Sequence, residues 1–62
     1  MSQTHDSIMS TIQTYSEENS KFTEKGVKAS ATRARKALAE LAKLIKARRK
    51  EIQETKNAQS AA

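Results

Sequence analysis

The segment KGVKASATRARKAL, residues 25–38, contains the only glycine of the chain and no acidic residue. Proline is absent from all 62 residues, so no other position is expected to stop a helix sharply. Glycine ends a helix at low cost because it enters the left-handed backbone conformation without a Cβ penalty. We therefore expect a helix that ends near Glu24 or Lys25, a turn over residues 25–27, and a second helix after it.

Apolar residues on both sides of this turn repeat with helical spacing. Before the glycine, intervals of four and three residues separate Ile8, Ile12, Tyr15, Asn19 and Phe22. After it, the same intervals separate Val27, Ala31, Ala34, Leu38, Leu41, Ile45, Arg48 and Ile52. Such spacing predicts one apolar stripe on each helix. The expected fold is a single all-α domain, residues 1–62, an antiparallel and coiled-coil-like helical hairpin with helices at about 6–24 and 28–57 and a frayed tail at 58–62.

The composition excludes several classes of function. A chain of 62 residues buries only about 60% of its unfolded surface, which leaves no room for a catalytic cleft. Cysteine is absent and His5 is the only histidine, so we expect no disulfide, metal site or cofactor. No stretch has the length and apolarity of a signal peptide or a membrane span. The sequence therefore favours a non-enzymatic cytoplasmic protein with no small-molecule substrate.

The second helix is expected to need a partner. It extends about ten residues, or about 15 Å, beyond the first helix, and this leaves Ile52 without an intramolecular contact. Ala37 and Leu44 lie beside the stripe and widen it to about 160° of the helix surface, more than one partner helix covers. We therefore expect a dimer or higher homo-oligomer, such as a four-helix bundle of two hairpins. The residues predicted for the core or the oligomer contact are Ile8, Ile12, Tyr15, Phe22, Leu38, Leu41, Leu44, Ile45 and Ile52.

Charge divides the chain into two halves. Residues 1–26 carry two basic and four acidic side chains, whereas residues 27–62 carry ten basic and three acidic ones. A step of about 100° per residue gathers six of these basic residues on one side of the second helix, and we call them the basic ridge. The basic ridge consists of Lys28, Arg35, Lys36, Lys43, Lys46 and Lys50, and with the neighbouring Arg33 and Arg49 it forms the candidate set of contacts to an anionic partner.

Several partners fit such a ridge. A solvated face, a nucleic acid, an acidic protein and an anionic membrane surface all remain open on charge alone. The membrane surface is disfavoured because the apolar stripe of the second helix is rich in alanine and lacks aromatic anchors. Tyr15 and Phe22, the only aromatic residues, lie on the apolar stripe, so stacking on single-stranded bases is not expected.

Four short motifs in residues 24–57 follow one another in a specific order. They are KG at 25–26, TRARKAL at 32–38, RKEIQ at 49–53 and KN at 56–57. In their order and spacing they resemble the bacterial histone-like family typified by the chlamydial linker-histone-like proteins. The resemblance implies a nucleoid-associated protein that binds DNA. The long tail of Lys, Ala and Pro in the chlamydial members is missing here, so DNA contact is expected from the hairpin itself.

Together these observations predict non-sequence-specific binding of double-stranded DNA through phosphates, with possible bridging or compaction of the DNA. Lysine dominates the ridge, and lysine acts as a point charge more than as a reader of bases. The alternative is a structural module whose basic face binds an acidic protein.

Overall fold

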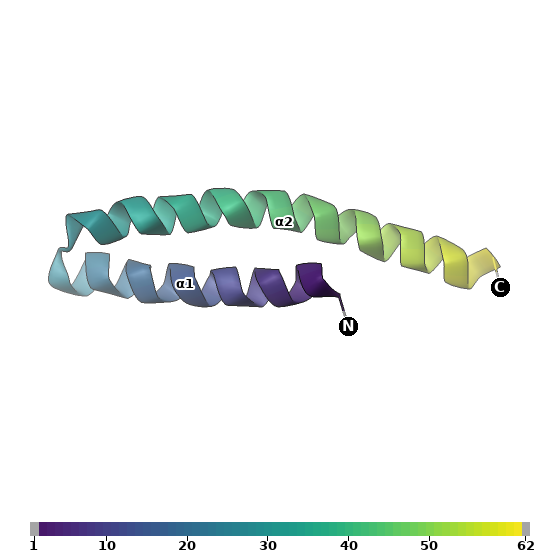
Figure 1. Cartoon of the computed structure of the whole chain (residues 1–62), viewed down its shortest axis with the longest axis horizontal. Coiled ribbons are helices and arrows are strands. Elements are labelled where there is room, and N and C mark those ends of the chain that lie inside the picture. The colour runs from purple at the N-terminus through teal and green to yellow at the C-terminus, as the bar shows by residue number, and fades with distance from the viewer. Residues whose placement is uncertain (1, 62) are drawn as a thin grey trace.

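The chain forms two antiparallel helices (Figure 1), which confirms the all-α hairpin. The computed structural model describes residues 2–61. Helix α1 spans Gln3–Lys25 and helix α2 spans Lys28–Ala61, and they lie side by side in a rod with Cα extents of 53 × 16 × 14 Å. Neither helix has, in this described range, the length and apolarity needed to cross a membrane.

Gly26 makes the turn between the helices. Its φ of 68° and ψ of 26° are left-handed, and its N–H donates to the carbonyl of Phe22 at 3.0 Å. A Cβ built on Gly26 would meet nothing within 4 Å, so the backbone conformation alone demands glycine. The N–H of Val27 donates to the carbonyl of Lys21 at 3.3 Å, and α2 begins one residue later. The sharp return of the chain therefore depends on one residue.

Helix α1 begins earlier than the expected start near residue 6. Ser2 is its N-cap, and the Ser2 Oγ accepts hydrogen bonds from the N–H groups of Thr4 at 3.1 Å and His5 at 3.3 Å. A serine oxygen that satisfies free amides is a strong helix start, and it adds a turn at the front of α1.

Helix α2 also continues further than expected, through Ala61 instead of ending near residue 57. The predicted frayed tail is therefore helical as far as Ala61, and Ala62 lies outside the described residues. Ser2 hydrogen-bonds to Glu51, so the ten residues 52–61 project beyond the N-terminus of α1, about 15 Å of helix (Figure 1).

The face of α2 that packs on α1 differs from the predicted stripe. Ser30, Ala34 and Ala37 are the buried residues, with exposed fractions of 0%, 8% and 8%. Ala37 was expected beside the stripe, together with Leu44, yet both point inward, and Leu44 is half-buried. Small side chains allow the two backbones to approach closely, and the bulky ones of α2 are displaced to the side. Of the residues predicted for the core or the oligomer contact, Leu38 and Ile45 are exposed in the single hairpin, so their predicted role in an oligomer contact stays a prediction.

The displaced side chains form a surface of their own, which we call the apolar edge. One open groove is lined by Tyr15, Phe22 and Leu38, and Ile45 and Ile52 continue the stripe of Leu38 at intervals of seven residues. Ile12 lies seven residues before Asn19, which lines the same groove. The apolar edge consists of Ile12, Phe22, Leu38, Ile45 and Ile52, and their exposed fractions run from 41% to 52%.

The hairpin has a very small core of its own. Within the described residues, Ala34 and Ala37 are the only buried apolar side chains. Ile8, Tyr15, Leu41 and Leu44 are half-buried between the helices. Apolar burial stabilises a fold by roughly 25 cal/mol per Å² of buried area. Two alanine side chains bury too little area to contribute much at this rate. The structure therefore leaves several of its large apolar side chains at a free edge, and those between the helices are only half-buried.

Candidate nucleic-acid interface

The basic ridge lies on the outer side of α2. All six of its residues are exposed. A step of about 100° per residue from the buried Ala34 and Ala37 places each of them on the half of the helix that faces away from α1. From Lys28 to Lys50 the ridge is about 33 Å long, close to the roughly 34 Å of one turn of duplex DNA.

The ridge carries uncompensated charge. Within residues 2–61 the basic residues that form ion pairs are Lys21, Arg33 and Arg48, and none of these belongs to the ridge. Arg49 lies outside the ridge but is one of the candidate contact residues. It is exposed and forms no ion pair within residues 2–61. Its position, four residues after Ile45, turns it toward the apolar edge.

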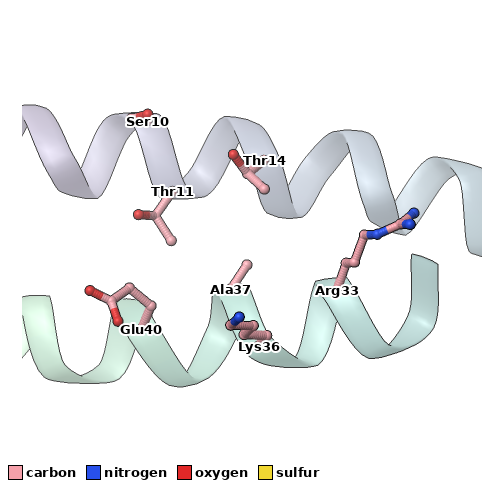
Figure 2. A pocket seen from close by; sticks show the side chains of 7 residues that line it. All are labelled: Ser10, Thr11, Thr14, Arg33, Lys36, Ala37 and Glu40. Carbon is pink, nitrogen blue, oxygen red and sulfur yellow. The ribbon is translucent and has the colours of Figure 1, made fainter. Parts of the chain in front are cut away.

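Arg33 behaves differently from the other candidates. Its side chain reaches toward α1 (Figure 2), and its Nη1 lies 3.7 Å from Oε2 of Glu18. The Arg33 side chain is 60% exposed, and it extends across the side of the hairpin toward α1. Arg33 therefore shares a groove with Lys36 of the ridge, but unlike the ridge residues it is paired with an acidic side chain.

Glu18 is the centre of a polar cluster near the turn. Its side chain is only 13% exposed, and its carboxylate oxygens lie 3.7 Å from Lys21 Nζ and 3.7 Å from Arg33 Nη1. An interaction with the Ser30 hydroxyl is the largest cause that lowers the pKa of Glu18; Lys21 and Arg33 lower it further, and desolvation opposes them. The cluster is loosely bonded, since neither Ser30 Oγ nor Glu18 Oε2 completes a well-aligned hydrogen bond within the described residues.

A second polar cluster closes the open end of the hairpin. The Glu51 carboxylate accepts hydrogen bonds from the hydroxyls of Ser2 at 2.6 Å and of Thr4, and from Arg48 Nη1 at 3.0 Å. The Ser2 and Thr4 hydroxyls, followed by Arg48, lower the pKa of Glu51 against its partial desolvation. We call this contact the terminal clasp, because it fixes the start of α1 to α2.

These two carboxylates make the stability of the hairpin dependent on pH. Both folded pKa values lie below the ordinary 4.5, so the stabilisation is complete above that pH and is lost as the pH falls through the lowered values. We expect the melting temperature, followed by circular dichroism, to fall between pH 6 and pH 3 by clearly less in a Glu18→Gln, Glu51→Gln variant than in the wild type. Glu17→Gln, which changes an exposed residue bonded only to Gln13 of its own helix, is expected to keep the wild-type fall. An equal fall in the double variant would contradict the assignment.

A shallow groove lies on the side of the hairpin that bears Arg33 (Figure 2). It has a volume of about 420 Å³, and Thr11, Thr14 and Ala37 point into the space between the helices. Lys36 of the basic ridge and Glu40 line its α2 side, so Glu40 lies next to the ridge. Ser10 and Arg33 complete the lining. An open groove with no enclosed cavity suits contact with an extended partner better than capture of a small molecule.

Helical rods of this kind, with an unpaired cationic face, are a class of protein suited to polyanions. The family described as histone H1-like protein Hc1 matches residues 2–58, and the chain belongs to this family. No curated protein and no solved structure matches the chain. The family consists of DNA-binding nucleoid proteins and not of enzymes, which agrees with the resemblance carried by the four sequence motifs. The chain is accordingly a DNA-binding, histone-like protein of the nucleoid in general terms.

Sequence reasoning missed the Glu18 cluster and the terminal clasp. Both join residues of α1 to residues of α2, so they depend on the register of the hairpin. One signal was present, because Glu18 and Lys21 are spaced for an i,i+3 pair on one helix.

Proposed function

We propose that this chain binds double-stranded DNA through its phosphates, with little sequence preference, and that the basic ridge supplies the contacts. The observation that carries the proposal is the row of six exposed basic side chains, none of which has an ion-pair partner within residues 2–61. Cations without a protein partner gain most from neutralising phosphates, because each contact releases condensed counterions. Arg49 supplements the row at its edge.

The chemistry of the ridge argues against reading of bases. Five of its six residues are lysines, which bind phosphates as point charges and lack the planar fork that recognises guanine. The two aromatic side chains lie elsewhere: Tyr15 is half-buried between the helices and Phe22 lies on the apolar edge. Binding of a duplex backbone therefore fits better than stacking on single-stranded bases.

We further propose that a second copy of the chain covers the apolar edge. Two buried alanines do not hold a hairpin of this length together, and five large apolar side chains remain 41% to 52% exposed along one edge. Pairing two edges would bury these side chains and enclose Ile52 on the projecting part of α2. Such a dimer would carry two basic ridges, and two ridges on separate faces would bridge or compact DNA.

A titration of duplex DNA at several salt concentrations tests the proposal. Neutralisation of about five phosphates predicts that log K falls against log salt with a slope near −4.5. Unrelated duplexes of equal length are expected to bind within a few-fold of one another, as measured by fluorescence anisotropy. An affinity that does not change with salt, or a hundredfold preference for one duplex, would refute a backbone-dominated mode.

A further inference from the structure

We propose that Lys21 and Arg33 form an additional phosphate site, which the Glu18 carboxylate occupies in the free protein. The site rests on the proposed DNA binding but extends it to α1, because Lys21 belongs to α1 and Arg33 to α2. The ligand of this site is a phosphate of the DNA backbone. In the free protein the Glu18 carboxylate takes the place of this phosphate.

The two cations and the Glu18 side chain differ in their exposure to solvent. The cations lie at the surface, with side chains 52% exposed for Lys21 and 60% exposed for Arg33. The Glu18 side chain between them is 13% exposed. A phosphate that approaches from solvent therefore reaches the two cations before it reaches the carboxylate.

The contacts within the cluster are weak enough to exchange. Both cations lie 3.7 Å from carboxylate oxygens, longer than the roughly 2.7–2.9 Å of a charge-assisted hydrogen bond. Because both cations are more than half exposed, solvent and salt screen their attraction to the carboxylate. A backbone phosphodiester carries the same single negative charge and the same two free oxygens as a carboxylate, so it can replace the carboxylate as the partner of both cations at little net cost.

The carboxylate does not depend on the cations alone. Ser30 is fully buried and is the first cause of the lowered pKa of Glu18, but neither Ser30 Oγ nor Glu18 Oε2 has a hydrogen-bond partner within the described residues. The Ser30 hydroxyl is therefore free to donate to the carboxylate when Lys21 and Arg33 turn outward to a phosphate. This arrangement lets the cations leave without exposing an unsupported buried charge.

Removing the internal carboxylate is expected to open the site. Glu18→Gln should steepen the salt slope by about one unit and tighten duplex binding by about eightfold at 100 mM salt, as one more phosphate is neutralised. Glu17→Gln is the matched control, because it removes the same charge from the adjacent position of α1, where no ion pair is formed. It is expected to change the affinity by less than about twofold, since charges beyond contact distance are screened.

Single substitutions of the cations give a second test that does not depend on the Glu18 variant. Arg33→Gln should weaken wild-type binding by less than about twofold, whereas Lys36→Gln, on the unpaired ridge, should weaken it by about eightfold. In the Glu18→Gln background, Arg33→Gln should cancel the gain. The inference is overturned if Glu18→Gln and Glu17→Gln bind alike, or if Arg33→Gln harms the wild type as much as Lys36→Gln does. Wild-type protein that fails to bind duplex DNA would instead refute the proposed function itself.

Discussion

Replacing Arg35, Lys43 and Lys46 by glutamine is expected to abolish most of the DNA affinity and to leave the hairpin intact. The three side chains are exposed, and each occupies the half of α2 turned away from α1. Loss of three phosphate contacts should flatten the salt slope by about 2.7 units, which corresponds to roughly a 500-fold weaker affinity at 100 mM salt. Fluorescence anisotropy with one labelled duplex, repeated at several salt concentrations, measures both quantities.

Stability is expected to change little in this variant. Glutamine forms helices about as well as lysine and arginine do, and surface substitutions usually alter the free energy of unfolding by less than about 0.5 kcal/mol. Circular dichroism and sedimentation should therefore match the wild type. Glu54→Gln, on the same helix, is a control for the substitution itself and should not weaken binding. If the triple variant is folded and binds DNA as well as the wild type, the ridge is a solvated face, and binding of an acidic protein becomes the better interpretation.

The hairpin could be predicted because one residue determines it. Gly26 is the one residue with a positive φ in the described range 2–61, and the stripes on either side indicate two helices of unequal length. The predicted ends of the two helices were less accurate. The cap by Ser2 depends on a hydroxyl that also donates to Glu51, a contact that local sequence does not reveal.

The rotation of α2 could not be obtained from the pattern. A stripe about 160° wide contains both Ala34 with Ala37 and Leu38 with Ile45, so hydrophobicity alone does not decide which part faces α1. Close approach of the backbones favours the small residues, and the larger ones remain at the edge. The prediction of the basic ridge does not depend on whether the small or the large residues face α1, because the ridge residues lie outside the apolar stripe. The Glu18 cluster, in contrast, exists only in the observed register, which brings Arg33 opposite α1.

The apolar edge leads to the second large effect, which concerns self-association. We expect the wild type to sediment as a dimer or higher oligomer at micromolar concentration, and a Leu38→Gln, Ile45→Gln variant to dissociate. Each of these side chains is 45% exposed in the hairpin, so the substitutions remove little contact within one copy. Across two copies they withdraw four apolar side chains, at about 1 kcal/mol each for the exposed part, and raise the dissociation constant by on the order of 100-fold or more.

The folding of the variant is expected to depend on its concentration, because Ala34 and Ala37 are the only buried apolar side chains in the part of the hairpin that the structure describes. Helicity by circular dichroism should therefore fall on dilution in the variant before it falls in the wild type, as it does when folding and association are coupled. Ala39→Gln adds a polar side chain on the outer face of α2, two residues beyond the buried Ala37, and should leave the sedimentation unchanged. A wild-type monomer that stays fully helical at micromolar concentration would show that the hairpin folds without a second copy on its apolar edge. Bridging of DNA by paired ridges would then lose its structural basis, although binding by a single ridge would not.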